Sequence, residues 1–336
     1  MTHKNTLQII AEIGVNHNGK ISIAKRLIDV AKKSGATAVK FQTYKTDNFV
    51  TKKTKKVKYQ ISKSNIKETH YEMLKKLELK IDDFRILKKY CIKNNIEFIS
   101  TPYDLESIDI LEKINVKRYK VASADIDDYL LHKKISFTNK QVIISTGMST
   151  ISDIKKVFKI YKKKNVVLLH CVSSYPCELK NSYISRITKL KKIFKVPVGF
   201  SDHTTSYEPA IMAYSLGARI FEKHITLSNN MSGPDHKASL NPKDFRNYVK
   251  KLNMAEKIYG KFKDKLLSIE KNMKTTSSKS ITLKRDLKNG SKITINDIIM
   301  KRPGRGLNGF FIPKIIGKKL KKNMTTNTQI TLKDFV

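Results

Sequence analysis

Short apolar runs alternate with amphipathic stretches over the first 260 residues of the chain. Apolar runs of this length are typical of buried strands, and apolar residues repeated at a spacing of about 3.6 predict helices between them. Two such helical faces are formed by Phe84, Leu87, Cys91 and Ile92 and by Ile154, Val157, Phe158 and Tyr161. The eight predicted strands are 8–15, 38–43, 97–101, 118–123, 141–146, 166–172, 196–201 and 219–226.

Strands that alternate with helices predict parallel βαβ units, and eight of them favour an α/β fold of the closed (β/α)8 TIM barrel type. An open doubly wound sheet is less favoured, because no Gly-x-Gly-x-x-Gly turn follows the first strand. One connection, residues 44–79, is unusually long and contains a lysine-rich run and a short helical pattern over 71–77. Such an insertion is either a lid over the site or a surface loop.

The pattern changes after Gly260. Residues 263–280 are polar and predict a linker, whereas 281–336 contain short apolar stretches separated by turn signals such as Asn289-Gly290. The predicted organisation is a TIM barrel over 1–262, a linker over 263–280 and a compact, mostly β domain over 281–336. Because so small a domain has little core of its own, we expect it to dock against the barrel or a second subunit.

The chain is strongly basic, with 68 Lys and Arg against 29 Asp and Glu and a formal net charge of +39. The lysines are spread over the whole length among many Ile and Asn, as AT-rich codons would produce. A nucleic-acid site would favour Arg and gather the charge on one face. We therefore expect no nucleic-acid partner, and keep a basic polyanion-binding protein as the non-enzymatic alternative.

Neither a membrane span nor a secretion signal is predicted, because the chain has no run of 18 apolar residues and no apolar stretch at its start. We therefore expect a cytoplasmic protein without a membrane partner. The three cysteines, Cys91, Cys171 and Cys177, form no Cys-x-x-Cys pair, and we interpret them as structural thiols.

Polar residues gather where the predicted strands end, which is where a TIM barrel builds its active site. They are Glu12, Lys40, Gln42, Thr101, Lys120, Ser123, Asp125, Ser145, His170, Ser173, Ser201, Asp202, His203, Glu222, Lys223 and His224. A single Ser or Thr there is often only a helix cap. Lys40 and Lys120, however, lie within apolar strands, where an ammonium group is costly unless it faces a ligand. Together with the hydroxyl groups they predict a site for phosphate or carboxylate.

His203 and His224 end the adjacent seventh and eighth strands, so their side chains could converge. Either histidine alone could be structural. Two imidazoles with open positions suit Mn, Fe, Co or Zn, and oxygen-rich remaining ligands favour Mn. Asp202 and Glu222 flank the pair, and Glu222 is placed to hold a metal-bound water.

Several motifs follow one another in a characteristic order. They are the segments 10–19, 39–43, 98–102, 144–148, 169–171, 199–204, 222–224 and 232–236, together with Lys301-Arg302-Pro303-Gly304 near the end. Through them the chain resembles the N-acetylneuraminate (sialic acid) synthases, including the legionaminate-type and related nonulosonate synthases, over essentially its whole length. The last motif is similar to the family's antifreeze-like (SAF) domain.

The resemblance implies a metal-dependent condensation of phosphoenolpyruvate with an N-acylated mannosamine-type sugar and water, in which the C–O bond of phosphoenolpyruvate is cleaved. The products are a nonulosonic acid and phosphate. N-acetylneuraminate synthase is the first expectation. Alternatives are a legionaminic or pseudaminic acid synthase using a 2,4-diacetamido-2,4,6-trideoxyhexose, and another metal-dependent barrel aldolase or lyase.

The resemblance also implies residue roles. His203 and His224 are the implied ligands of a divalent cation, Mn²⁺ before Mg²⁺ or Co²⁺. The implied phosphoenolpyruvate contacts are Lys40, Thr101, Lys120, Ser123, Ser145, Ser173 and Ser201. Glu12, Tyr175 and Asp235 surround the sugar, and Arg302 reaches the N-acyl group from the other subunit of a domain-swapped homodimer. The candidates for catalytic proton transfer or water positioning are Glu12, Asp125, Glu222 and Asp235.

This chain departs from the family pattern at two of these positions. Asp125 follows Ala124 where many members have Gly-Glu, and Ser173 stands in place of an Asn.

Overall fold

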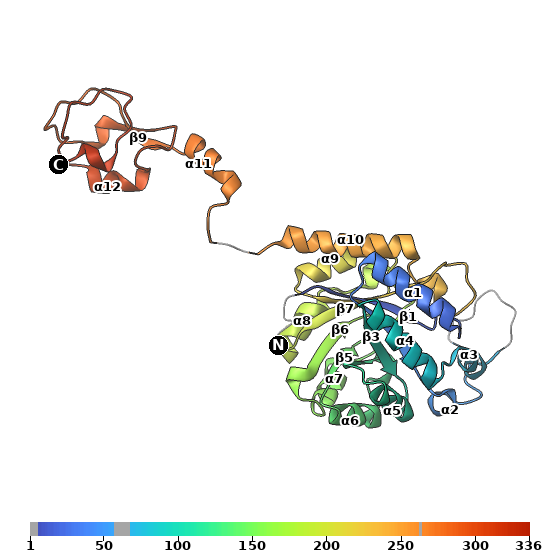
Figure 1. The fold of residues 1–336 in the computed structure, drawn as a ribbon. Coiled ribbons are helices and arrows are strands. Elements are labelled where there is room, and N and C mark those ends of the chain that lie inside the picture. Colours follow the sequence, from blue (N-terminus) through green and yellow to red (C-terminus); the bar gives the residue numbers. More distant parts are fainter. Residues whose placement is uncertain (1–5, 57–67, 262–263) are drawn as a thin grey trace. The chain divides into compact units, whose positions relative to one another are not determined.

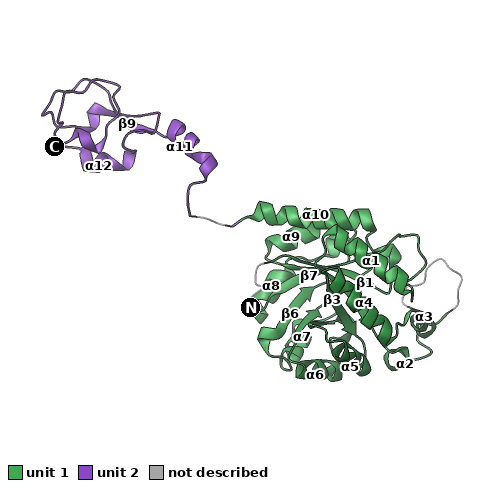
Figure 2. Cartoon of the chain, viewed as in Figure 1, with its two compact units in different colours: residues 1–260 green, residues 261–336 purple. Residues whose placement is uncertain are grey.

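The computed structural model describes residues 6–56, 68–261 and 264–336 (Figure 1). The first five residues, residues 57–67 of the long connection and the predicted domain boundary at 262/263 lie outside this part. The chain divides into two compact units, 1–260 and 261–336 (Figure 2). Within the described ranges, none of the helices combines the length and the apolarity that crossing a bilayer requires.

The first unit is a closed barrel of parallel strands in chain order, with the last strand paired to the first. The predicted TIM barrel is confirmed, and each predicted strand has a counterpart. The strands are β1 (Gln8–Gly14), β2 (Ala38–Thr43), β3 (Glu97–Pro102), β4 (Arg118–Val121), β5 (Gln141–Ser145), β6 (Val166–His170), β7 (Val198–Asp202) and β8 (Ile220–His224). At β4 the strand ends two residues earlier than predicted, because Ser123 already begins a 3-10 turn, Ser123–Asp125.

Helices cover the outside of the barrel (Figure 1). They are α1 (Ile21–Ser34), α2 (Thr46–Phe49), α3 (His70–Leu77), α4 (Ile81–Lys93), α5 (Leu105–Lys113), α6 (Tyr129–Phe137), α7 (Ile151–Phe158), α8 (Arg186–Phe194), α9 (Glu208–Ser215) and α10 (Pro242–Tyr259). The helix predicted within the long connection is α3, which begins at a capping box of Thr69 and Glu72. On α4 one residue was misplaced: Ile92 is 63% exposed, because it lies off the buried face of Phe84, Leu87 and Cys91.

The inside of the barrel contains a separate apolar layer, formed by Ile10, Ala38, Ile99, Ile143, Val167 and Leu169. Successive side chains of a strand point to opposite faces, so the residue two positions further on also points inward. The residues that continue these rows toward the carboxyl ends are Glu12, Lys40, Thr101, Ser145 and Cys171. The apolar layer thus forms the floor of a polar chamber.

The amino end of the barrel is closed by a polar cluster around Arg118. Its guanidinium makes two 2.9 Å hydrogen bonds to the Glu97 carboxylate and further bonds to Gln8 at 2.8 Å and Gln141 at 3.3 Å. All four residues stand at the start of their strands. This end is therefore closed by groups that satisfy one another.

The second unit contains α11 (Lys271–Ser277), the antiparallel pair β9 (Ser280–Leu283) and β10 (Ile298–Lys301), and α12 (Ile312–Ile315). Its own apolar core includes Ile281, Leu283, Ile293, Leu320 and Ile330. Residues 263–280, which we predicted as a linker, contain α11 and belong to this unit, whose first residue is Lys261.

Candidate active site

Two lysines and two glutamates meet inside the carboxyl end of the barrel. Lys40 Nζ lies 3.2 Å from Glu12 Oε2 and 3.6 Å from Glu222 Oε2, and Lys120 Nζ lies 3.8 Å from Glu222 Oε1. All four side chains are almost fully buried. Four residues from four strands, β1, β2, β4 and β8, therefore form one charged centre.

Neutral groups supply part of the hydrogen bonding of this centre, whereas Glu12 Oε2 and Glu222 Oε2 have no hydrogen-bond partner. Lys40 Nζ donates to Thr101 Oγ1 at 3.1 Å, and Ser201 Oγ donates to Glu222 Oε1 at 3.0 Å. Gln42 Nε2 donates to Glu12 Oε1 at 3.2 Å. Each group comes from an inward-facing position at or near the end of its strand.

The charged groups differ in how the protein shifts their pKa values. Burial alone would raise the pKa of Glu222, but Lys120 and Lys40 outweigh it and lower the pKa to about 2. Burial raises the pKa of Glu12 to about 7. Lys40 opposes this shift, and the nearby Glu222 carboxylate adds to it. For Lys40 the two carboxylates outweigh burial and raise the pKa, whereas burial lowers the pKa of Lys120. The centre thus holds two lysines beside one firmly ionised carboxylate, that of Glu222, and a second carboxyl group, that of Glu12, which is only partly ionised at neutral pH.

A second polar cluster surrounds Gly147, just after β5. The Gly147 N–H donates to Ser123 Oγ at 3.0 Å and to Cys171 Sγ at 3.1 Å. A Cβ atom at this glycine would lie 2.5 Å from Ser173 Oγ and 2.9 Å from both Ser123 Oγ and Cys171 Sγ. Side chains from the ends of β4 and β6 therefore crowd the backbone at the end of β5, and only glycine leaves them room.

The structure also brings His203 and His224 together, as predicted. Their ring centroids are 5.9 Å apart, and the Tyr175 ring lies 4.2 Å from His203 and 5.9 Å from His224. His203 Nδ1 is 2.7 Å from the Val172 carbonyl oxygen, so Nδ1 carries the proton when the ring is neutral and Nε2 is left as the lone-pair donor. Burial lowers the pKa of His203 to about 4 and, with His203 beside it, that of His224 to about 3. Both rings are therefore neutral at pH 7.

These two imidazoles fit a divalent cation in their chemistry. His224 Nδ1 is buried and has no hydrogen-bond partner, and the nearby Asp235 Oδ2 is 4.0 Å away. Neutral imidazole nitrogens are the form that binds metals. Within the described residues, no group of three or more His, Cys, Asp and Glu side chains is arranged to hold a metal ion. A cation here would have two protein ligands and take its remaining ligands from water or substrate.

Asp235 extends the site toward Glu12. A Cβ atom at Gly14 would lie 3.3 Å from Glu12 Oε1 and 3.6 Å from Asp235 Oδ2, so the two carboxyl groups flank the same backbone. The loop that carries Asp235 is fixed by Ser239, which donates to the Asp235 carbonyl oxygen at 2.7 Å and accepts from Asn16 at 2.8 Å. Burial raises the pKa of Asp235 to about 6.

The remaining predicted residues lie at the edge of this cluster or outside it. Ser145 is buried at the end of β5. Asp125 follows β4 with Oδ2 buried and unpaired, and burial together with Asp128 raises its pKa to about 7. Arg302 belongs to the second unit, where it is exposed after β10.

Three strand-end residues that we expected at the site point away from it. His170 faces outward, where its Nε2 is 2.7 Å from the Ser182 carbonyl oxygen and its ring stacks on Phe200. Asp202 and Lys223 pair with each other on the outer side of β7 and β8. Strand alternation explains all three, because each directly precedes or follows an inward residue.

Cys171 was missed as a site residue, because we interpreted it as a structural thiol. Its sulfur lies 3.0 Å from Ser123 Oγ and accepts from Gly147. Alternation from inward-facing Leu169 could have predicted this position.

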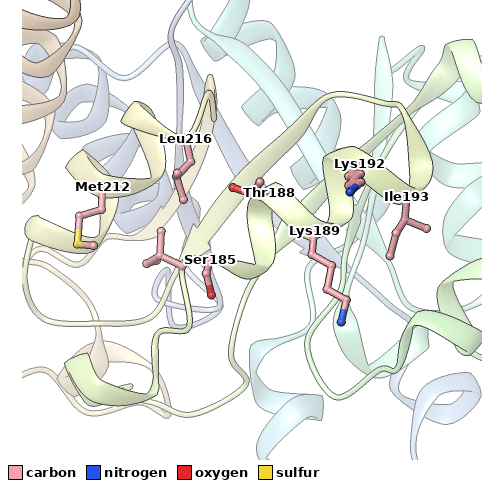
Figure 3. Close-up of a pocket in the computed structure, with 8 residues that line it drawn as sticks. Ser185, Thr188, Lys189, Lys192, Ile193, Met212 and Leu216 are labelled. Atoms are coloured by element: carbon pink, nitrogen blue, oxygen red, sulfur yellow. The ribbon is translucent and has the colours of Figure 1, made fainter.

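An open hollow on the outer surface is not part of this site (Figure 3). It is lined by Ile184, Ser185, Thr188, Lys189, Lys192, Ile193, Met212 and Leu216, from α8, α9 and their flanking residues. It contains none of the predicted site residues and no carboxylate or imidazole. The chemistry lies inside the barrel instead.

Known family patterns and related proteins match nearly the whole length of this chain. The sequence pattern of the NeuB family matches residues 27–264, and that of the SAF domain matches residues 278–336. An uncharacterized protein of Methanocaldococcus jannaschii is 41% identical over 94% of this chain and 90% of its own. The N,N'-diacetyllegionaminic acid synthase of Campylobacter jejuni is 38% identical over 95% of this chain and 97% of its own.

A solved structure shares the architecture of the barrel and much of the sequence. The N-acetylneuraminic acid (sialic acid) synthetase of Leptospira borgpetersenii, crystallised with citrate, superposes with a TM-score of 0.70 at 33% identity. The match covers 80% of this chain and 90% of that one.

Proposed function

This chain belongs to the NeuB family of nonulosonic acid synthases, and from that premise we propose that it condenses phosphoenolpyruvate with an N-acylated amino sugar, releasing phosphate. The observation that carries the proposal is the charged centre of Lys40, Lys120, Glu12 and Glu222. Lys40 and Lys120 both lie beside the ionised Glu222 carboxylate, whereas Glu12, with its pKa raised to about 7, is only partly ionised at neutral pH. Two lysines beside only one firmly ionised carboxylate suit a multiply charged anion.

The groups around Gly147 suit the oxygen atoms of that anion. Ser123 and Ser173 present hydroxyl groups at the same point, and Ser145 and Thr101 stand at neighbouring strand ends. Hydroxyl and ammonium groups held in place before the substrate arrives stabilise charge that moves during the reaction. We assign Lys40, Thr101, Lys120, Ser123, Ser145, Ser173 and Ser201 to phosphoenolpyruvate.

His203 and His224 would hold the divalent cation, for which we propose Mn²⁺, with Mg²⁺ and Co²⁺ as alternatives. When bound, the cation supplies a Lewis acid for the aldehyde oxygen of the open-chain sugar. Tyr175, packed against the His203 ring, and Asp235, 4.0 Å from His224, would then line the sugar side of the site. C3 of phosphoenolpyruvate attacks the aldehyde carbon on this side, and water adds at C2 before phosphate leaves.

Proton transfer needs carboxyl groups that change charge near neutral pH. Glu12, Asp125 and Asp235 meet this condition, with pKa values raised to about 7, 7 and 6. Glu222 does not, because its pKa is lowered to about 2. We therefore assign Glu222 to fixing the two lysines and orienting water, and proton transfer to the other three.

The acceptor sugar is proposed from the named relatives. Identity to the Campylobacter legionaminic acid synthase, 38%, exceeds the 33% to the Leptospira sialic acid synthetase. We therefore favour a 2,4-diacetamido-2,4,6-trideoxyhexose, and the product N,N'-diacetyllegionaminic acid. N-acetylmannosamine, our first expectation from the sequence, stays the second candidate because of the Leptospira structure.

The SAF domain is assigned to the acceptor through Arg302, which would reach the barrel of a second subunit in a domain-swapped homodimer. Arg302→Ala should then raise KM for the sugar about tenfold or more, as expected for one charged hydrogen bond, and leave KM for phosphoenolpyruvate nearly unchanged. An effect confined to phosphoenolpyruvate, or a monomer by light scattering, would contradict this assignment.

The proposed function is tested by phosphate release from phosphoenolpyruvate with each sugar and each metal. Release that needs both the sugar and a divalent cation, and that is fastest with the diacetamido sugar, supports it. A Schiff-base aldolase, which Lys120 with its lowered pKa could serve, would instead be trapped by borohydride. A lysine adduct, or release independent of any sugar, would exclude the proposed condensation.

A further inference from the structure

A buried ion pair lies on the outer side of β7 and β8. Asp202 Oδ2 is 3.1 Å from Lys223 Nζ, and the two side chains are 0% and 1% exposed. The residues face each other in the register of the two parallel strands. Each directly precedes one of the two histidines in the sequence, so the pair bridges the backbones that carry the imidazoles.

Further hydrogen bonds connect the pair to the backbone around His203. Asp202 Oδ1 accepts from the backbone N–H of Thr204 at 2.9 Å and from its hydroxyl at 2.8 Å. Lys223 Nζ donates to the carbonyl oxygen of Thr204. In the sequence, His203 thus lies between Asp202, which is one member of the pair, and Thr204, which both members bind. Its ring is held separately, by the Val172 carbonyl oxygen.

Lys223 is also fixed from the helix layer. Its ammonium group lies 5.2 Å from the centre of the Tyr248 ring, on α10, and Tyr248 is itself buried. A buried ion pair seldom gives the most stable core, since apolar side chains of similar volume often stabilise the folded protein equally or more. Its directed hydrogen bonds, however, fix atoms in a way that apolar packing does not.

We infer that Asp202 and Lys223 are positioning residues that set the spacing of the His203 and His224 imidazoles, and through it the affinity for a divalent cation. The inference rests on the metal site proposed above. Groups behind a metal ligand that orient it commonly change metal affinity by about 10 to 100-fold when they are replaced. Strand alternation allows this arrangement, because the outward residues can hold the strand ends without entering the site.

The test uses the double variant Asp202→Asn with Lys223→Met in the full chain. It removes both charges, so neither partner is left buried and unpaired, and Asn keeps the oxygen that accepts from Thr204. The matched control is Glu97→Gln with Arg118→Met, which removes an ion pair from the other end of the same barrel. Circular dichroism establishes the folded fraction of each protein.

The first measurement is Mn²⁺ binding, followed by the electron paramagnetic resonance of free Mn²⁺. At equal folded fraction, the Asp202/Lys223 variant should bind Mn²⁺ about tenfold more weakly than wild type. The control should bind as wild type does. Wild-type affinity in the Asp202/Lys223 variant, or equal weakening in the control, would overturn the inference.

The second measurement needs no metal and separates this inference from the metal site itself. In ¹⁵N-histidine-labelled protein, the imidazole resonances of His203 and His224 are assigned with His203→Gln and His224→Gln. Both should shift in the Asp202/Lys223 variant and stay in place in the control. If wild type binds no Mn²⁺, the proposed metal site fails, and these resonances alone decide the positioning role: unchanged resonances refute it.

A third variant covers the case in which the double variant does not fold. Lys223→Arg keeps the charge but replaces a compact ammonium by a planar guanidinium, so the pair cannot keep its spacing. It should shift both imidazole resonances and weaken Mn²⁺ binding, whereas unchanged values in both measurements would equally refute the inference.

Discussion

The two ends of the barrel bury charges in different ways. At the amino end, Arg118 binds Glu97 through two hydrogen bonds of 2.9 Å and uses its remaining nitrogen on Gln8 and Gln141. At the carboxyl end, Lys120 lies 3.8 Å from Glu222, and one oxygen of Glu222 has no hydrogen-bond partner. Both ends are enclosed by the same strands.

The difference shows which charges serve the fold and which serve a ligand. A planar guanidinium paired with a carboxylate leaves no group unsatisfied, so the amino end needs nothing further. Ammonium groups with loose partners, a buried unpaired imidazole nitrogen and carboxyl groups of raised pKa leave the carboxyl end incomplete. An incomplete buried polar cluster is stable only because the rest of the barrel supports it.

The largest effect is expected from His203→Ala. Because a Lewis acid contributes several kcal/mol of transition-state stabilisation, phosphate release should fall about a thousandfold. The melting temperature should change little, since the imidazole makes only one hydrogen bond to the backbone. Turnover that survives both this substitution and chelation would show that the histidines do not serve a metal.

Lys120→Met should have the next largest effect. Losing one of two cations at the anion site should lower kcat/KM for phosphoenolpyruvate about a hundredfold, with a smaller change in KM for the sugar. Steady-state kinetics with each substrate varied in turn measures this. A loss that falls mainly on the sugar would place Lys120 on the other side of the site.

Arg118→Met, at the amino end, should have the opposite outcome: a loss of stability without a loss of turnover. Removing Arg118 leaves the Glu97 carboxylate, whose side chain is 26% exposed, without its partner, so the free energy of unfolding should fall by about 2 kcal/mol. The turnover of the protein that remains folded should be unchanged, because Arg118 lies below the apolar layer. Urea denaturation and an activity assay corrected for folded protein check both statements, and lost turnover would mean that the two ends are coupled.

The smallest effect concerns pH. Asp125 has a pKa raised to about 7 in the folded protein, above its ordinary value of 3.8. The folded state therefore binds the proton more tightly, so this contribution to stability is present below pH 3.8 and is lost as pH rises through 7. Asp125→Asn should remove that loss, so that the difference in unfolding free energy between pH 5 and pH 8 shrinks. An unaltered difference would mean that Asp125 titrates normally.

Much of the fold could be predicted because its signals are local. Apolar runs separated by helical periodicity predicted each barrel strand, and Lys40 and Lys120 stood out because an ammonium group in an apolar strand needs a partner. The same signals failed where neighbouring residues differ only in which face they occupy. His170, Asp202 and Lys223 were grouped with the site for this reason, whereas Cys171 was left out of it.

The sequence by itself determined the barrel, the small second domain and the set of residues able to do chemistry, since strand and helix periodicity are properties of short segments. Only the tertiary structure decided which of those residues meet. Closure of β8 onto β1 brings Glu222 beside Lys40, which is far away in the chain, and the pairing of β7 with β8 brings His224 beside His203. Burial in that closed chamber then shifts their pKa values, because it removes the water that would stabilise their charged forms. No local sequence pattern specifies this loss of water.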